Sequence, residues 1–405
     1  MIKELLFNVY FSVFILFINT SISDNFLRAL FINPSLISIT RLLTNIIFIL
    51  IVIYYFLIER IRIRKYILGI AMLVLMVLTL AWTPNKFESI KLIINIIGPL
   101  YYFLLLCLNV KKGKILKIIR VYCIIILVFD IIALILPSGI GYMDSVSKVL
   151  NGIHLSRSSF VVYINFIIFI NWIYFMQNRN KYNTNSIIPC IVIMLSLILV
   201  IISKSSTGLI TILLFFIFTL VLRRKKLSYY IFYFSLITGI VLPFMHLNSP
   251  ILDKIVTIIF GKTLTFSGRT YIWKYVLGNL IDNPILGNGF NSTHTLLADK
   301  VVPIYDRVAA HSHNGFLEVF LQSGIIGLIL VVTILITAFR LTEYMRKVQK
   351  SIFKSYIITL IIFNYMEPYL NDQVSLITVW LPIIYIIVSK YKDIKNNLYK
   401  IDCEK

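Results

Sequence analysis

Two histidines stand one residue apart directly before a long apolar run, in AHSHNGFLEVFLQSGIIGLIL at residues 310–330. Histidine changes charge near neutral pH, so His311 or His313 could serve as a general base. The pair could also bind a metal ion or simply end a loop. A metal site needs further ligands, and the remaining candidates are scattered along the sequence: His294, Asp299, Asp306 and Glu318. We therefore interpret one histidine as a general base and expect no metal.

Glu318 lies about one turn into the apolar run, assuming that this run is a helix. It could orient or polarise one of the histidines, or it could be a polar residue that faces the interior of a helix bundle.

Basic residues lie near the ends of three other apolar stretches. They are Arg157 in HLSRSSF, Lys204 in ISKSSTGL and Arg269 in SGRTYIWKYVLGNLID. Arg157 and Lys204 could be snorkelling residues at a membrane surface. Together, the three cations could instead neutralise the negative charge that develops on a leaving group.

The composition indicates that membrane helices carry these residues. Of the 405 residues, 59% are hydrophobic and 14% are charged, with a mean hydropathy of +0.90. Soluble domains are closer to roughly 45–50% apolar and 25% charged. Repeated apolar runs are long enough to cross a bilayer. We predict an all-α, polytopic integral membrane protein with about 12 transmembrane helices, at residues 5–22, 36–58, 66–82, 90–108, 116–136, 158–176, 187–203, 207–222, 228–246, 316–339, 355–370 and 374–389.

The net charge of +22 would suit a nucleic-acid-binding protein, but the positions of the charges favour a membrane topology. With the N-terminus inside, 26 of the 39 Lys and Arg residues lie on inner segments, which follows the positive-inside rule. We therefore predict no nucleic-acid partner. The expected organisation is nine helices in 1–246, one large extracytoplasmic loop at 247–312, and three helices with a cytoplasmic tail in 313–405.

The large loop contains an apolar stripe at helical spacing that includes Ile272, Trp273 and Val276. The stripe predicts an amphipathic helix at about 269–281 and, by itself, favours a helix that rests on the membrane surface. It does not explain Arg269 at the helix start. DNPILGNGF follows, and its proline and glycines predict a turn.

The expected reaction follows from the side of the membrane. An outward-facing enzyme lacks nucleotide donors, and the sequence contains neither D-x-D nor a P-loop. The activated substrate would therefore arrive in the lipid, as a polyprenyl-pyrophosphate-linked glycan does. Cations would stabilise the leaving pyrophosphate, and a histidine would take the proton from the acceptor hydroxyl. No cofactor is expected.

Three segments together resemble the O-antigen ligase and polymerase superfamily of bacterial membrane glycosyltransferases. AHSHNGFLEVFLQSGIIGLIL resembles its H-N-x-x-L…G-x-x-G motif, GRTYIWKYVLGNLIDNPILGNGFN its R-x-x-x-W…N-P-x-x-G-x-G-F segment, and ISKSSTGLITILLFF its S-R-x-x-x segment. The resemblance covers about residues 200–330.

The resemblance assigns roles to individual residues. His313 matches the family's essential histidine, which makes it the base and His311 a neighbour. Arg269 matches the arginine thought to bind pyrophosphate. Lys204 stands where arginine is usual, so it keeps the charge but loses the planar two-point contact. Asn314 and Trp273 are expected to shape the site.

The interpretation also includes Gly324, Gly327 and Arg157. Gly324 and Gly327 are expected to let a neighbouring helix approach closely. Arg157 is expected to bind pyrophosphate or glycan alongside Arg269 and Lys204.

The resemblance implies a metal-independent glycosyltransferase in the bacterial cytoplasmic membrane, with its active site on the extracytoplasmic face. A polymerase that joins undecaprenyl-pyrophosphate-linked repeat units into O-antigen or capsular polysaccharide is favoured. The alternatives are an O-antigen ligase that transfers the finished glycan to lipid A-core, and a lipid-linked oligosaccharide flippase. The expected partners are the lipid-linked donor and acceptor, the bilayer, a flippase and a chain-length regulator.

Overall fold

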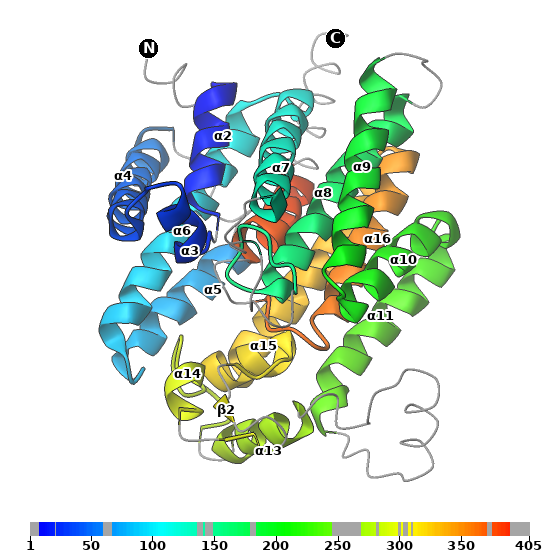
Figure 1. The fold of residues 1–405 in the computed structure, drawn as a ribbon. Helices are drawn as coiled ribbons and strands as arrows, with labels where there is room; N and C mark the ends of the chain where they lie inside the picture. Colours follow the sequence, from blue (N-terminus) through cyan, green and yellow to red (C-terminus); the bar gives the residue numbers. More distant parts are fainter. Residues whose placement is uncertain are drawn as a thin grey trace, which may run out of the picture.

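The structure, a computed structural model, describes residues 8–20, 22–59, 67–135, 141, 149–178, 184–244, 269–280, 283–298, 301–302, 307–308, 311–370 and 375–388. Most of these residues are helical (Figure 1). The elements are α2 (Val9–Ile18), α3 (Asp24–Ala29), α4 (Pro34–Glu59), α5 (Ile67–Leu78), η2 (Thr79–Ala81), α6 (Lys86–Asn109), α7 (Lys112–Ile135), α8 (Arg157–Asn178), α9 (Thr184–Ile202), α10 (Ser206–Val221), α11 (Lys225–Val241), η3 (Leu242–Phe244), α13 (Arg269–Leu280), α14 (Thr293–Leu296), β1 (Val301–Val302), β2 (Arg307–Val308), α15 (Gly315–Leu341), η4 (Thr342–Tyr344), α16 (Lys347–Phe363) and η5 (Leu376–Trp380).

Six helical segments among the described residues are long and apolar enough to cross a membrane: Pro34–Ile51, Lys86–Asn109, Lys112–Ile135, Arg157–Asn178, Lys225–Phe244 and Gly315–Tyr344. Shorter apolar helices accompany them. The chain is therefore a helical, multi-pass membrane protein, and about twelve spans remains a prediction. The prediction of an all-helical chain missed the short antiparallel pair of β1 and β2.

The buried centre of the bundle is formed by α8 and α16. Both helices are buried on most sides along most of their length, which is typical of helices enclosed by other helices. The rings of Phe169 and Tyr356 stack with centroids 3.9 Å apart where the two helices meet. α9 and α10 pack against α8, and α10 and α11 pack against α16.

One predicted span ends earlier than expected. The apolar pattern suggested a helix at 355–370, but α16 ends at Phe363 and a turn follows from Asn364 to Met366. Glu367 consequently lies in the connection after α16 rather than inside a membrane helix.

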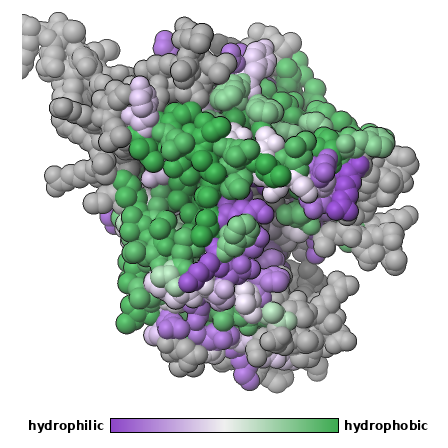
Figure 2. Space-filling view, turned by 90° about the vertical axis from the view of Figure 1, so that its left-hand side faces the viewer, coloured by the Kyte–Doolittle hydropathy of each residue, from purple (hydrophilic) through white to green (hydrophobic). Residues whose placement is uncertain are grey.

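The described parts of the large loop gather at one end of the bundle. In Figure 1, α13 and α14 lie at the bottom, next to the start of α15. In Figure 2, hydrophobic residues cover much of the upper and left parts of the surface, and hydrophilic residues gather lower down. This polar end carries the candidate site.

Candidate active site

One carboxylate joins the two residues that the sequence singles out for chemistry. Arg269 Nη2 donates a hydrogen bond of 2.9 Å to Glu367 Oε1. His313 Nδ1 lies 4.0 Å from the other oxygen, Glu367 Oε2. Arg269 begins α13, His313 precedes α15, and Glu367 follows α16, so three separate segments converge here.

Glu367 sits in a buried and electropositive environment. Its side chain is only 9% exposed. Burial raises the pKa of Glu367 above its ordinary value, while Arg269, a hydrogen bond with Ser158, and the charges of His311 and Arg157 oppose that rise. The hydrogen-bonded arginine is the strongest of these opposing influences, and we describe the pair as an ion pair.

His313 is neutral in this environment. Burial, followed by the positive charges of Arg269 and His311, lowers the pKa of His313 to about 3. Its Nδ1 atom is buried and makes no hydrogen bond within the described structure. The side chain as a whole nevertheless remains 31% exposed, so a substrate can still reach the ring. A neutral, accessible imidazole can accept a proton.

The backbone at His313 is held in an unusual conformation. Its φ angle is 52°, in the left-handed region that non-glycine residues seldom adopt. Asn314, the next residue, caps α15: its Oδ1 accepts hydrogen bonds from the backbone N–H groups of Phe316 and Leu317. Its Nδ2 donates to the carbonyl oxygens of Gly239 and Tyr365. The turn that carries His313 is thereby tied to α11 and to the connection after α16.

The side chain of Glu318 supports the same turn by binding the backbone of Ser312. Its Oε2 accepts a hydrogen bond of 2.9 Å from the N–H of Ser312. Its Oε1 accepts hydrogen bonds from Thr293 and from Gln322. Within the described residues Glu318 makes no hydrogen bond with a histidine ring. It is buried, as expected for a polar residue that faces the interior of the bundle, and it binds the N–H of Ser312, the residue before His313.

Trp273 links the amphipathic helix to the histidine turn. Its Nε1 donates a hydrogen bond of 3.0 Å to the carbonyl oxygen of Ser312. The apolar face of α13 packs against Leu317 and Leu321 of α15. The expectation that this face rests on the membrane surface is therefore wrong, because α15 buries it. This packing places Arg269 beside Glu367.

Gly324 breaks α15 rather than admitting a neighbouring helix. Its backbone angles are φ 62° and ψ −166°, which are not helical. The N–H of Ile325 donates to the carbonyl oxygen of Pro284, and the N–H groups of Asn288 and Gly289 donate to the carbonyl oxygens of Leu321 and Gln322. The turn at 284–289 thus supplies the hydrogen bonds that the break leaves open. Gly327, by contrast, faces Ser323 and Leu75.

The other two predicted cations, Arg157 and Lys204, lie in different environments. Arg157 begins α8 and is close enough to influence Glu367 electrostatically. Lys204 is exposed in the turn between α9 and α10, with a φ angle of 52°. Gly208 contacts Val161 one turn into α8, so this turn lies near the same end of α8 as Arg157. In the described structure Lys204 makes no ion pair with the Arg269–Glu367–His313 cluster.

His311 is an exposed neighbour of His313. The ring centroids are 5.7 Å apart, with the planes at 67°. Within the part of the chain that the structure describes, no group of three or more His, Cys, Asp and Glu side chains is placed to hold a metal ion.

Glu367 is the site residue that the sequence reasoning missed. The motif-bearing region ends near residue 330, and the predicted span at 355–370 includes Glu367. The available signal was an acidic residue in an otherwise apolar stretch, directly followed by Pro368. Such acids are costly in a membrane and commonly functional.

Comparisons with known proteins cover the middle of the chain. The sequence profile described as O-Antigen ligase matches residues 191–332, which include Lys204, Arg269 and His313 but not Glu367. The chain is 33% identical over 86 residues to "Exopolysaccharide production protein ExoQ" of Rhizobium meliloti (strain 1021), covering 20% of each chain.

A second similar protein comes from Rickettsia conorii (strain ATCC VR-613 / Malish 7). It is named "Putative polysaccharide ligase RC0486", and it is 37% identical over 68 residues, covering 15% of this chain and 16% of that protein. The matched segments span a fifth or less of the length of either relative. The O-antigen ligase profile thus matches residues 191–332, with the histidine turn and the arginine of α13 among them, and both relatives are named for polysaccharide production or ligation.

Proposed function

We propose that the chain transfers a glycan from a polyprenyl-pyrophosphate carrier to an acceptor hydroxyl, on the extracytoplasmic face of the bacterial cytoplasmic membrane. The observation that carries this proposal is the cluster of Arg269, Glu367 and His313 at the polar end of the bundle. It combines a cation for a phosphate leaving group with a neutral imidazole for a hydroxyl proton.

Arg269 and Arg157 bind the pyrophosphate in this proposal. Arg269 presents the planar guanidinium that suits two-point contact with phosphate oxygens. The bond between the sugar and the phosphate oxygen breaks, and its electron pair leaves with the pyrophosphate. The positive charge of the arginines stabilises that leaving group.

His313 accepts the proton of the attacking hydroxyl as the new glycosidic bond forms. A proton on Nδ1 would face Glu367, which leaves the lone pair of Nε2 for the hydroxyl. The low pKa of His313 in the substrate-free protein results from burial and from the nearby cations. A bound pyrophosphate neutralises those cations and therefore raises the pKa of His313 toward the range in which it is an effective base.

We further propose that this transfer is polymerisation and needs no metal ion. The donor and the acceptor would both be lipid-linked repeat units. The similarity to an exopolysaccharide production protein supports a role in polysaccharide production. The alternative is ligation of a finished glycan to a final acceptor such as lipid A-core, which the family's description and the Rickettsia relative favour.

Purified protein in liposomes separates these activities. With a lipid-linked repeat unit as both donor and acceptor, a polymerase produces a ladder of longer glycans, in EDTA as well as with added divalent ions. A ligase produces a single transfer product only when lipid A-core is added. Movement of the lipid between leaflets without a new covalent bond would reject glycosyl transfer and indicate a flippase, and a requirement for one divalent metal would reject metal independence.

A further inference from the structure

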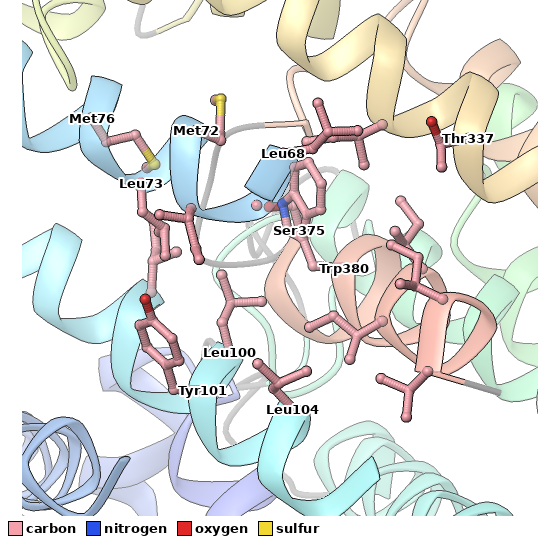
Figure 3. A pocket seen from close by; sticks show the side chains of 18 of the residues that line it. Leu68, Met72, Leu73, Met76, Leu100, Tyr101, Leu104, Thr337, Ser375 and Trp380 are labelled. Atoms are coloured by element: carbon pink, nitrogen blue, oxygen red, sulfur yellow. The ribbon is translucent and has the colours of Figure 1, made fainter. Parts of the chain in front are cut away.

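Two buried ionisable side chains lie apart from the apolar pocket of the bundle and close to the start of α8. The pocket has a volume of about 340 Å³ and is lined mainly by Leu, Ile and Met side chains of α5, α6, α15 and residues 375–388 (Figure 3). Asp130 of α7 and His154, in the connection before α8, do not line it, and both side chains are 0% exposed. Arg157, a residue of the candidate active site, lies three positions after His154.

Asp130 is costly to bury at its position. α7 is apolar enough to cross a membrane, and the acid stands in the stretch IIILVFDIIALI. A carboxylate in such a helix is destabilising unless other groups compensate for it. Here Asp130 Oδ1 accepts a hydrogen bond of 3.0 Å from the backbone N–H of Ile153. His154 Nε2 lies 3.6 Å from the same oxygen. Both compensating groups belong to the segment that leads into α8.

This segment fits closely around the Asp130 side chain. Gly152 has a φ angle of 57°, and a Cβ atom there would lie 2.2 Å from Asp130 Oδ1. The absence of a side chain at this position therefore lets the backbone approach the carboxylate. The His154 ring stacks on Tyr163 of α8, with the ring centroids 4.4 Å apart. The backbone before α8 is thus fixed against α7 and against α8 itself.

The other end of the same segment reaches the candidate active site. Ser156 caps α8, because its Oγ accepts a hydrogen bond from the N–H of Ser159. Ser158, in the first turn of the helix, makes a hydrogen bond with Glu367, and the charge of Arg157 influences the same carboxylate. The backbone N–H that binds Asp130 lies only four positions before Arg157.

We propose that Asp130 is a positioning residue for the candidate active site: by binding the backbone of Ile153, it sets the start of α8 and thereby places Arg157 beside Glu367. The proposal rests on the proposed function, because that function makes Arg157 a ligand of the pyrophosphate. Asp130 is fully buried and acts through Arg157 rather than on the substrate. It also lies outside residues 191–332, so a part of the chain that the profile does not match contributes to the site.

Two substitutions at Asp130 test the backbone contact. Asp130→Ala removes it, whereas Asp130→Asn keeps an oxygen that can accept the bond from Ile153. We expect Asp130→Ala to lower kcat/KM for the lipid-linked donor roughly ten-fold, and Asp130→Asn to stay within about three-fold of the native value. Tyr102→Phe is the matched control, because it removes another buried hydrogen bond, of 2.8 Å to Ser12 Oγ. It should leave kcat/KM unchanged.

A double-mutant cycle with Arg157 separates positioning from general damage. Arg157→Ala should itself lower kcat/KM for the donor. Adding Asp130→Ala should then change the value by no more than about two-fold, because no guanidinium remains to be positioned. Independent effects would instead multiply, and the double variant would show the product of the two separate losses.

A second measurement requires no turnover. In a variant without native cysteines, a nitroxide spin label on Leu155→Cys reports on the backbone before α8, and Leu155 is 59% exposed. Asp130→Ala should increase the mobility of this label but not of a label on Thr295→Cys, which is exposed in α14. Asp130→Asn should change neither. The expected mobility in a protein that transfers no glycan to any acceptor would reject the proposed function, while the effect of Asp130 on the start of α8 would stand.

Three results, each at equal levels of folded protein, would overturn the role of Asp130. The first is a multiplied loss in the double variant with Arg157→Ala. The second is an equal kcat/KM for Asp130→Ala and Asp130→Asn. The third is a label mobility that rises at both Leu155→Cys and Thr295→Cys, or at neither. Gly152→Ala pushes the same backbone away from Asp130 and replaces Asp130→Ala in these tests if that variant does not accumulate.

Discussion

Glu367 lies between the candidate phosphate-binding residue and the candidate base, because it binds the Arg269 guanidinium and faces the His313 ring. Glu367→Gln keeps the shape of the side chain and removes its charge. We expect transfer to fall by roughly 10- to 100-fold, the usual effect of losing a charged hydrogen-bond partner. Glu367→Asp should recover part of the loss. Transfer rates that match the native protein, at equal levels of folded protein in the membrane, would remove Glu367 from the site.

The lowered pKa of His313 makes a prediction about pH. A general base works in its neutral form, which is lost as the pH falls through its pKa. Because burial, Arg269 and His311 lower this pKa, the acid limb of kcat/KM, which reports the free enzyme, should lie well below the ordinary histidine value near 6.5. The profile of kcat/KM against pH measures it. An acid limb at or above 6.5 would contradict the environment described for His313.

Arg269 and His313 can be recognised from the local sequence around them, whereas the role of Glu367 cannot. Arg269 and His313 each lie in a segment whose local pattern is informative on its own. Glu367 stands out locally only as an acid in an apolar stretch, and its place in the site follows from its contact with Arg269, 98 positions away. No local spacing in the sequence encodes that contact, so only the fold shows it.

At the scale of elements, the break in α15 at Gly324 is the place where the turn at 284–289 packs against this helix. A Cβ atom at Gly324 would lie 2.0 Å from the carbonyl oxygen of Ile285, and the φ angle of 62° disfavours other residues. Gly324→Ala should therefore destabilise the protein by at least about 1 kcal/mol, seen as a lower Tm in detergent. A Cβ at Gly278 in α13 would meet no atom within 4 Å, so Gly278→Ala should be neutral or slightly stabilising. Equal Tm values for Gly324→Ala and the native protein would contradict the docking of 284–289 at the break.

The sequence predicted elements better than their contacts. The spacing of Ile272, Trp273 and Val276 gave a helix where α13 lies, but the same stripe fits either a membrane surface or another helix. The neighbours Leu317 and Leu321 decide between them, and these lie in a segment read as part of a membrane span. The glycines of the turn and of α15 were recognised as special, but their pairing depends on tertiary structure.

At the scale of the whole molecule, the charge asymmetry predicts which end of the bundle faces outward. In a variant without native cysteines, Thr295→Cys in α14 should react with a membrane-impermeant thiol reagent in intact cells. Arg224→Cys, between α10 and α11, should react only after the cells are opened. Both residues are exposed in the structure, so access is not limited by burial. The reverse labelling pattern would place the candidate site on the cytoplasmic side.

Composition and apolar length were enough to predict a helical membrane protein, because spans must satisfy their own backbone hydrogen bonds. They were not enough to fix the span ends. Asn364 begins a turn that the apolar pattern around it conceals, and the helix therefore ends before Glu367. Side-chain contacts between distant segments determine such endings.

In the proposed function His313 is the base of the glycosyl transfer, and substitutions of the two neighbouring histidines test this role. His313→Ala should reduce transfer from a lipid-pyrophosphate glycan by roughly 10²- to 10⁴-fold, the usual contribution of positioned proton transfer. Donor binding should persist, because Arg269 and Arg157 remain. His311→Ala, at the exposed neighbour, should have a mild effect. With both variants inserted at native levels, near-normal glycan synthesis by His313→Ala together with an inactive His311→Ala would contradict the account.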